Sequence, residues 1–455
     1  MNGDTIAAIS TPLGEGGIGI VRLSGPQSAE ILSRIFLPRK ARCHVVPWRL
    51  TYGHVVDPED GRAIDEVLAV HMPAPNTYTR EDVVEINCHG GYAPLQAILS
   101  LALRHGARLA HPGEFTLRAF INGRIDLAQA ESVLDVIQAR TQIGLRVAVD
   151  QLGGRLSKEV SRVRGVVISA LAYLTATIDF SDDEIPEQDV QGPLAEAIAG
   201  VEQLLNSADA GIIYRQGLRT AIVGRPNVGK SSILNALLRE NRAIVTPVPG
   251  TTRDTLEEVI NVKGLPVVLV DTAGIAATDD LVERLGVERS RGAMERADLV
   301  LWVVDGSSPL TDHDREIALD LCAKPVIVVV NKCDLDTVVG EEHLRELVPG
   351  SSLVRTSALT GEGLHQLEEK ITETVFAGRA SASDALLVSN PRHKDALARA
   401  LDHLRAAIGG VVGGMPADFV TIDLTAAASA LGEITGETVS EDLLETIFSK
   451  FCVGK

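Results

Sequence analysis

The sequence predicts a multidomain fold in which an α/β domain interrupts a mainly helical domain, behind an N-terminal α+β domain. Three observations predict this division. Short apolar runs alternate with Gly and Pro over residues 1–118, and apolar residues follow helical spacing over 119–215 and 380–455. Strands alternate with helices over 216–379. The length of 455 residues suits about three domains, and a domain can be inserted where its two ends lie close together.

The composition favours a folded, soluble protein. Hydrophobic residues make up 45% of the chain, too many for general disorder. Lys and Arg number 43 and Asp and Glu 61, so the net charge is −18. This argues against a protein that coats nucleic acid by bulk charge. Apolar runs stay well short of the ~18 residues of a membrane helix, and the first residues lack the pattern of a signal peptide. We therefore expect a cytoplasmic protein without a membrane span.

Cysteine and histidine give no sign of a disulfide framework or a structural metal. The cysteines have no CxxC spacing and number five: Cys43, Cys88, Cys322, Cys333 and Cys452. The 11 histidines include no HExxH pair. Cys452 differs from the others because it lies beside the last residues, where no core requires it.

The first domain reads as strands with one clear helix. Apolar runs at 18–23, 67–71 and 83–86 predict strands, and residues 93–103 follow helical spacing. We expect a small α+β domain over residues 1–118.

The helical domain is predicted from periodicity on both sides of the insertion. Helical spacing is carried first by Leu127, Ala130, Val133, Leu134 and Ile137. Further helical patterns cover 193–210, 386–408 and 424–451, and the acidic stretch 179–189 is interpreted as a solvated connection.

The inserted segment has the pattern of repeated βα units. Short apolar strands are predicted at 220–223, 267–270, 299–304, 326–330 and 353–355. Residues 231–238 and 364–375 are predicted helices between or after them. Such units form a mostly parallel sheet with helices on both faces.

A glycine-rich loop lies between the first of these strands and its helix. Residues 224–231, GRPNVGKS, fit GxxxxGK[ST] in the strand–loop–helix context that the motif requires. Glycines let backbone N–H groups surround phosphate oxygens, and the helix N-terminus adds positive potential. Lys230 suits the β and γ phosphates, and the Ser231 hydroxyl suits Mg²⁺.

Two further motifs indicate that the base is guanine. Asn331-Lys332-Cys333-Asp334 ends the strand at 326–330, and a carboxylate at Asp334 can accept from both N1–H and the 2-amino group of guanine. Adenine lacks that donor pair. Residues 357–359, Ser-Ala-Leu, follow the last strand and are placed to support the base.

The remaining motifs are typical of segments that respond to the γ-phosphate. Asp271-Thr272-Ala273-Gly274 ends a strand, where Asp271 can hold Mg²⁺ through water. In Thr251-Thr252-Arg253-Asp254, a Thr can complete the Mg²⁺ shell. The order of all five motifs predicts a Ras-like P-loop domain that binds GTP and GDP.

The group that orients the attacking water is not fixed by spacing. Many GTPases place Gln directly after the DTAG motif, but this chain has Ile275, which cannot orient water. The acids on the following segment are Asp279, Asp280, Glu283 and Glu288. Arg253 or a monovalent cation could supply the positive charge of an arginine finger.

Taken together, the motifs resemble the MnmE (TrmE) family of tRNA uridine-34 modification GTPases, over essentially the whole chain. The resemblance rests on NVGKSS at 227–232, PGTTRD at 249–254, LVER at 281–284, residues 77–85, PGEFT at 112–116, AFINGR at 119–124 and FCVGK at 451–455. The N-terminal blocks and the terminal segment are specific to this family, whereas other GTPases share the nucleotide motifs. The family often has Arg where this chain has Ala276.

The resemblance implies a K⁺-stimulated GTPase whose G domains pair across their nucleotide sites. Its K⁺ ligands match Asn227, Thr246, Val248 and Thr251, its Mg²⁺ ligands match Ser231 and Thr252, and its water-positioning acid matches Glu283. The GTP-binding residues expected here are Asn227, Val228, Gly229, Lys230, Ser231, Ser232, Thr246, Pro247, Val248, Pro249, Gly250, Thr251, Thr252, Asp271, Thr272, Ala273, Gly274, Asn331, Lys332, Asp334, Ser357, Ala358 and Leu359. Lys230, Glu283 and Cys452 are the expected catalytic residues.

The resemblance also implies a folate site and a protein partner. Residues that match the family's contacts to a 5-formyl- or methylene-tetrahydrofolate are Arg22, Glu85, Arg124 and Lys455. The family forms a homodimer through this N-terminal domain. With an FAD protein of the MnmG type, in a hetero-oligomer, it installs aminomethyl or carboxymethylaminomethyl groups at C5 of the wobble uridine of tRNA. Cys452 matches the family's terminal cysteine.

Two other classes of function are compatible with parts of the sequence. A ribosome-assembly or stress-related GTPase switch would share the nucleotide motifs, but it would need neither the N-terminal blocks nor Cys452. A folate-binding scaffold with a vestigial G domain is disfavoured by the intact Lys230, Ser231, Asp271 and Asp334. A basic cluster on one predicted helix, formed by Arg155, Lys158, Arg162 and Arg164, is a hypothesis for tRNA contact.

Overall fold

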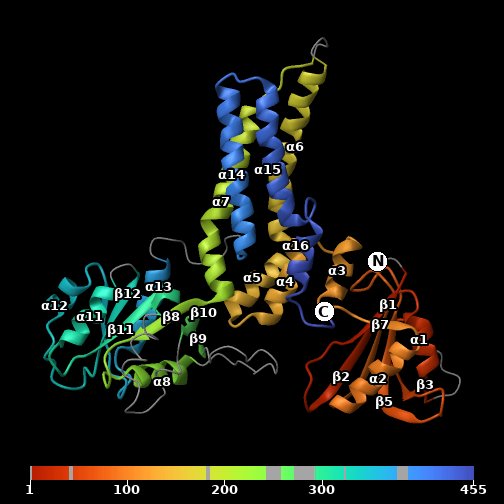
Figure 1. Cartoon of the computed structure of the whole chain (residues 1–455), viewed down its shortest axis with the longest axis horizontal. Helices are drawn as coiled ribbons and strands as arrows, with labels where there is room; N and C mark the ends of the chain where they lie inside the picture. Colours follow the sequence, from red (N-terminus) through yellow and green to blue (C-terminus); the bar gives the residue numbers. More distant parts are fainter. Residues whose placement is uncertain are drawn as a thin grey trace. The chain divides into compact units, whose positions relative to one another are not determined.

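The computed structural model describes residues 3–39, 45–180, 185–241, 258–270, 292, 294–321, 324–376 and 388–455 (Figure 1). The chain forms two compact units. Unit 1 comprises residues 1–134, 152–164 and 428–455, and unit 2 comprises 135–151 and 165–427. No helix among the described residues has the length and apolar character needed to cross a membrane.

Unit 1 is built on a seven-stranded sheet in the order β3-β4-β5-β6-β2-β1-β7. Only the β1–β7 pair is parallel, and the other neighbouring strands run antiparallel. The strands are β1 (Thr5–Ile9), β2 (Gly16–Ser24), β3 (Phe36–Pro38), β4 (Thr51–Val56), β5 (Ala63–Met72), β6 (Val83–Gly90) and β7 (Ala107–Leu109). The strands predicted at 18–23, 67–71 and 83–86 are confirmed.

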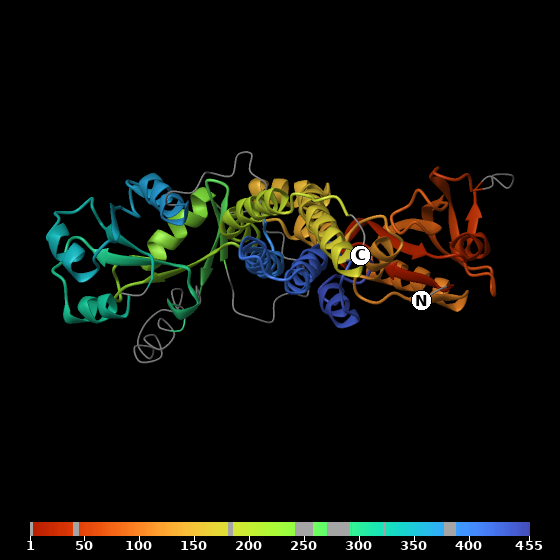
Figure 2. The same cartoon turned by 90° about the horizontal axis from the view of Figure 1, so that it is seen from above.

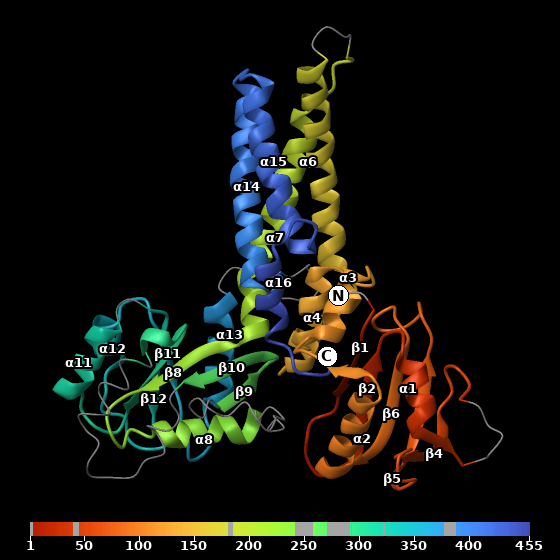
Figure 3. The ribbon, with the colours of Figure 1, turned by 45° about the vertical axis from the view of Figure 1, so that its right-hand side comes forward.

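Two helices, α1 (Ser28–Ile35) and α2 (Tyr92–Arg104), cover one face of this sheet (Figure 3). Ile31 of α1 and Ile98 of α2 pack in one core with Val21 and Ile86 of the sheet. The buried residues of a helix, such as Ile31 and Ile35 of α1, recur every three or four positions. Those of a strand, such as Val21 and Leu23 of β2, recur every second position. The buried faces therefore follow from the two periodicities that the sequence carries.

The two ends of the chain meet within unit 1. Helix α3 (Glu114–Ile121), the start of α4 (Leu127–Gln138) and α16 (Glu441–Phe448) share a core in which Ala119, Leu127, Phe448 and Phe451 are buried. The predicted helix over 424–451 is in fact two helices, because α15 (Ala417–Thr435) ends before Gly436. Gly436 has φ +92°, and a side chain there would overlap Phe120.

Unit 2 contains a six-stranded sheet in the order β13-β12-β11-β8-β10-β9. All neighbours are parallel except β9 and β10. The strands are β8 (Leu218–Val223), β9 (Glu258–Val262), β10 (Leu265–Val270), β11 (Leu299–Asp305), β12 (Val326–Asn331) and β13 (Ser352–Arg355). The five predicted strands are confirmed, and β9 is an additional edge strand.

Helices cover both faces of this sheet. Ile233 of α8 (Lys230–Asn241) and Leu367 of α13 (Leu364–Phe376) pack on one face, and Ala318 of α11 (Asp312–Asp320) and Leu344 of α12 (Glu341–Leu347) pack on the other. Successive residues of β11 point to opposite cores, so the strand is apolar throughout. The predicted fold class, an N-terminal α+β domain followed by a helical domain with an inserted P-loop α/β domain, is confirmed.

The rest of unit 2 is helical. It holds α5 (Gln142–Leu152), most of α6 (Arg155–Asp179), α7 (Gln191–Gln216), α14 (Pro391–Val412) and the first part of α15. Figure 2 looks down this group of helices. Helices α7 and α14 are joined by ion pairs from Arg405 to Glu202 at 2.7 Å and from Lys394 to Asp209 at 2.6 Å. Helix α7 then continues through Gly217, at φ +88°, into β8.

Candidate functional site

The glycine-rich loop at 224–229 connects β8 to α8 in a tightly packed turn. Gly224 has φ +150° and Gly229 has φ +98°, and a Cβ atom at these positions would overlap the Val303 carbonyl oxygen and the Asn331 amide, respectively. Asn227 is exposed and takes φ +64°, which is uncommon for a residue with a side chain. The loop therefore brings backbone N–H groups to the N-terminus of α8, the geometry that binds phosphate.

The ammonium group of Lys230 lies inside this loop. Its Nζ donates to the carbonyl oxygens of Gly224 at 2.7 Å and Arg225 at 2.8 Å. Burial lowers the pKa of Lys230, which makes an anion a favourable partner for its charge. Ser231 and Ser232 follow in the exposed first turn of α8.

Asn331, at the end of β12, connects the glycine-rich loop to the other two motifs. Its Nδ2 donates to the Val228 carbonyl oxygen at 2.9 Å. Its Oδ1 accepts from the backbone N–H of Ala358 at 3.2 Å. The three loops that the sequence assigns to one nucleotide are therefore held together by one buried amide.

The base-recognition motif presents an oriented carboxylate. Ser357 Oγ donates to Asp334 Oδ1 at 2.5 Å and accepts from the backbone N–H of Thr360 at 3.2 Å. Lys332 Nζ donates to Asp305 Oδ2 at 2.7 Å. The sequence predicted the roles of Asp334 and Ser357 in base recognition, but it gave no role to Asp305.

Several predicted residues lie outside the described residues. These are Thr246, Pro247, Val248, Pro249, Gly250, Thr251, Thr252, Arg253, Asp271, Thr272, Ala273, Gly274, Ile275, Ala276 and the four acids including Glu283, together with Cys43 and Cys322. Of the expected Mg²⁺ and K⁺ ligands, the structure places Ser231 and Asn227.

A second polar site lies on the face of β2 and β6 that is opposite α1 and α2. Arg22 of β2 and Glu85 of β6 are paired in register, and the Arg22 Nε and Nη2 atoms contact Glu85 Oε1 at 2.8 and 2.7 Å. Arg22 Nη1 donates to the Gly454 carbonyl oxygen at 3.4 Å, and the guanidinium lies 5.8 Å from the centre of the Phe115 ring. The structure thus brings together Arg22, Glu85 and the chain terminus.

The terminal segment is anchored beside this pair. Val453 forms a bridge to Pro112, and the Gly113 N–H donates to the Cys452 carbonyl oxygen at 3.4 Å. Cys452 itself is exposed. Arg124 lies on the ring of Tyr78, with its guanidinium carbon 4.7 Å from the ring centre. Sequence reasoning missed the supporting aromatic residues Tyr78 and Phe115.

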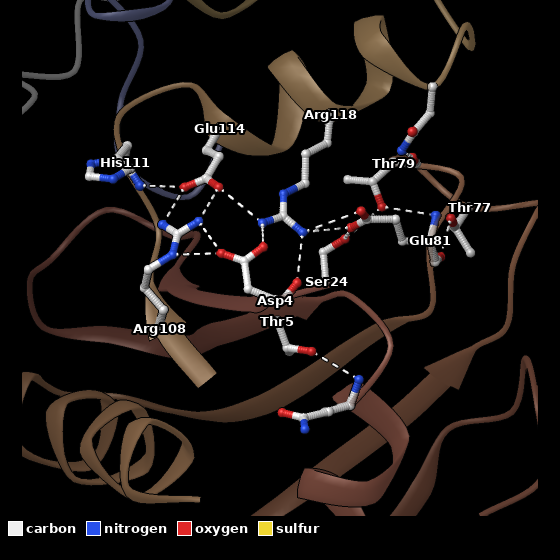
Figure 4. A network of polar contacts seen from close by, with 12 residues as sticks. Asp4, Thr5, Ser24, Thr77, Thr79, Glu81, Arg108, His111, Glu114 and Arg118 are labelled. Atoms are coloured by element: carbon white, nitrogen blue, oxygen red, sulfur yellow. Dashed lines mark hydrogen bonds and ion pairs between the residues drawn. The ribbon is translucent and has the colours of Figure 1, made fainter. Parts of the chain in front are cut away.

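A partly buried ionic network, with Arg118 and Glu114 at its buried centre, connects the sequence blocks at 77–85 and 112–116 (Figure 4). Arg118 is 6% exposed and contacts Asp4 at 2.8 Å, Glu114 at 3.0 Å and Glu81 at 3.1 Å. Arg108 contacts Glu114 at 2.6 Å and Asp4 at 2.7 Å. The network fixes α3, which carries Phe115, to the start of β1.

We predict that Glu114→Gln destabilises unit 1, by about 3 kcal/mol, because it removes one partner of buried ion pairs. Burial raises the pKa of Glu114, but hydrogen bonds from Arg108, the His111 N–H and Arg118 outweigh this effect and hold the pKa below its usual 4.5. The stabilisation is therefore complete above that value and is lost as pH falls through the lowered pKa. Glu59→Gln is the matched control, since Glu59 is exposed in its pair with Arg104.

Urea unfolding, monitored by pulsed hydrogen exchange on peptides from β1 and α3, measures the free energy of unfolding of this region. An equal loss in the Glu59 variant, or no loss in the Glu114 variant, would contradict a stabilising role for the network.

The four basic residues predicted as a cluster on α6 differ in exposure and in their partners. Arg155, Lys158 and Arg162 are exposed. Arg164 is instead held by the Ala428 carbonyl oxygen at 3.0 Å and by Glu437. The Arg164 guanidinium therefore already has partners within unit 1, and tRNA contact by the cluster stays a prediction.

A glycine-rich loop that carries Lys230 is joined by Asn331 to the loop of Ser357 and Ala358, and Ser357 orients the Asp334 carboxylate. This set of motifs on a mostly parallel sheet is that of a P-loop GTPase. The family model described as the MnmE helical domain matches residues 127–452, and the model of the GTP-binding protein TrmE N-terminus matches residues 5–124. The chain belongs to the MnmE family of tRNA modification GTPases.

Relatives of this family match the chain end to end. The tRNA modification GTPase MnmE of Chloroflexus aurantiacus is 54% identical over 99% of this chain and 100% of its own length. The MnmE proteins of Roseiflexus sp. RS-1 and Roseiflexus castenholzii are each 53% identical, over 99% and 100% of this chain.

Proposed function

We propose that this chain is a K⁺-stimulated GTPase that acts with an MnmG-type FAD protein to modify C5 of the wobble uridine in tRNA. The observation that carries the proposal is that Asn331 bonds both the loop that contains Lys230 and the loop that contains Ser357, which orients Asp334. The full-length match to MnmE relatives supports the tRNA substrate. Three domains are proposed: 1–118, 119–215 with 380–455, and an inserted G domain at 216–379.

The phosphate end of the site fits Mg²⁺ and K⁺ through oxygen ligands. Ser231 offers a hydroxyl in the first turn of α8, and the exposed Asn227 offers an amide oxygen at the turn of the loop. Thr252 is proposed to complete the Mg²⁺ shell, and Thr246, Val248 and Thr251 the K⁺ shell. Bound there, the cations offset negative charge on the phosphates. Lys230 orients the β and γ phosphates, and Glu283 positions the attacking water.

The second polar site supports a folate one-carbon donor. Glu85 can accept from the amino and ring N–H groups of a pterin, and Arg22 holds that carboxylate in place. Arg124, supported by Tyr78, and Lys455 add positive charge that suits the carboxylates of a folate. Homodimerisation through the N-terminal domain, a hetero-oligomer with the FAD protein, and a role for Cys452 in modification belong to the same proposal.

GTP hydrolysis in KCl and in NaCl at equal ionic strength tests the proposal. We predict faster turnover in KCl, because a dehydrated K⁺ fits oxygen ligands at Asn227. Asn227→Ala should lose the difference between the salts while keeping its affinity for GDP. Equal wild-type rates in the two salts would contradict the cation site and leave the guanine site standing.

A further inference from the structure

Residues 305–314, which run from the last residue of β11 into the first turn of α11, contact both the loop that follows β12 and the glycine-rich loop. Asp305 is paired in register with Asn331. The Gly306 N–H donates to the Asn331 carbonyl oxygen at 2.8 Å, and the Val338 N–H donates to the Gly306 carbonyl oxygen at 2.8 Å. Backbone hydrogen bonds alone therefore fix this segment to the loop that follows β12.

At the base end, a buried carboxylate holds Lys332. Lys332 takes φ +65°, and its Nζ donates to Asp305 Oδ2 at 2.7 Å. The other oxygen of Asp305 accepts from Ser307 N–H at 2.9 Å and Oγ at 2.7 Å. Both carboxylate oxygens are thus engaged, so the position of the Lys332 ammonium is set by a fixed counter-charge.

The charge state of Asp305 agrees with this geometry. Burial raises the pKa of Asp305, but hydrogen bonds from Lys332 and Ser307 outweigh that effect and hold the pKa below its usual value. The group is therefore a carboxylate at neutral pH. Lys332 lies two residues before Asp334 in the loop that follows β12.

At the phosphate end, the same segment holds Arg225. Arg225 Nη2 donates to Ser308 Oγ, and its Nε lies 3.5 Å from Asp314 Oδ2. The Asp314 side chain is 0% exposed, and its Oδ2 also accepts from Thr311 N–H at 2.9 Å and Oγ1 at 2.8 Å. The carbonyl oxygen of Arg225 in turn accepts from Lys230. Arg225, which Ser308 and Asp314 contact, is therefore part of the loop that holds the Lys230 ammonium.

We propose that residues 305–314 form a brace that positions both nucleotide loops, with Asp305 acting through Lys332 and with Ser308 and Asp314 acting through Arg225. The brace rests on the nucleotide site proposed above. The brace connects the two loops through charged side chains, in addition to the direct hydrogen bond from Asn331 to the Val228 carbonyl oxygen. Asp305, Ser308 and Asp314 are positioning residues, since each contacts a side chain of one of the two loops.

Asp305→Asn tests the base end, because it removes the charge and keeps the shape. We expect the Kd for a fluorescent GDP to rise about tenfold, the effect of losing a hydrogen bond between charged groups. The kcat at saturating GTP should stay within about twofold, since binding of the base is the step affected. Asp312→Asn is the matched control, with the same charge change on a 94% exposed side chain of the same segment.

A double-mutant cycle separates positioning from a general loss of structure. In a Lys332→Met background, Asp305→Asn should add less than about twofold to the Kd, because its partner is already absent. Ser307→Ala provides a milder second variant, with an expected increase of about threefold. Unchanged GDP affinity in folded Asp305→Asn, or full multiplication of the two effects, would overturn the role of Asp305.

Ser308→Ala tests the phosphate end by removing the acceptor for Arg225. We expect about a threefold weaker affinity for GDP, and no further loss when it is placed in an Arg225→Met background. Full additivity there would overturn this half of the brace. A wild-type protein that fails to bind GDP would refute the nucleotide site itself, whereas normal wild-type binding with unaffected variants refutes only the brace.

Discussion

Replacing Asp334 with Asn is expected to change the preferred base from guanine to xanthine. The carboxylate accepts from guanine N1–H and the 2-amino group, whereas an Asn side chain can donate to the carbonyl oxygen that xanthine carries at C2. Ser357 Oγ already orients the carboxylate from 2.5 Å. A site built to pair with a donor loses about 10⁴-fold when that pairing fails, so we expect a loss of that order for GTP.

Competition between GDP and XDP for a fluorescent nucleotide measures this change. Asp336→Asn is the matched control, because Asp336 is an exposed carboxylate two residues further along the same loop. Asp334→Asn that still prefers GDP would show that another group reads the base.

Glu283→Ala is expected to hydrolyse GTP about 10²- to 10⁴-fold more slowly than the wild type, the usual contribution of a group that handles a proton or orients a water. GTP affinity should be unchanged, because the loops that hold the nucleotide are those of Lys230 and Asn331. Single-turnover hydrolysis and fluorescent nucleotide binding measure the two quantities separately.

The nearby acids provide the controls for this prediction. Asp279→Ala, Asp280→Ala and Glu288→Ala change the same charge within the same segment and should leave hydrolysis close to wild type. Normal turnover by Glu283→Ala, or an equal loss in one of the other variants, would remove the role assigned to Glu283.

The sheet of unit 2 and the main nucleotide motifs could be predicted because their signals are local. Strands β11 and β12 are buried along their whole length, so each reads as a continuous apolar run that ends in a polar residue. The carboxyl ends of parallel strands lie on one edge of the sheet. Motifs that follow those strands, such as Asn331–Asp334, could therefore be assigned to one site.

Contacts between distant segments could not be predicted, because periodicity shows which face is buried and not what covers it. Arg118 meets Asp4 across 114 positions, and Arg22 meets Gly454 across 432. The return of Phe451 to the core of α3 and α4 depends on such contacts. Strand β9, a short edge strand with polar Glu258 and Asn261, also lacks a strong apolar pattern.

Asp305 is the residue whose role a closer reading of the pattern could have found. It ends β11 as Asn331 ends the neighbouring β12, and the two are paired in register. A charged residue at the carboxyl end of a buried parallel strand belongs to the same edge of the sheet as the nucleotide motifs. What it contacts, the ammonium of Lys332, required the structure.

One reconstitution tests the proposal that GTP hydrolysis by this chain drives modification of the wobble uridine. Unmodified tRNA is incubated with the chain, its FAD protein partner, a folate one-carbon donor and GTP, and the nucleosides are analysed by mass spectrometry. We expect a C5-modified uridine with the wild type and little with Glu283→Ala. Equal modification by both proteins, or with GDP in place of GTP, would show that hydrolysis does not drive the modification.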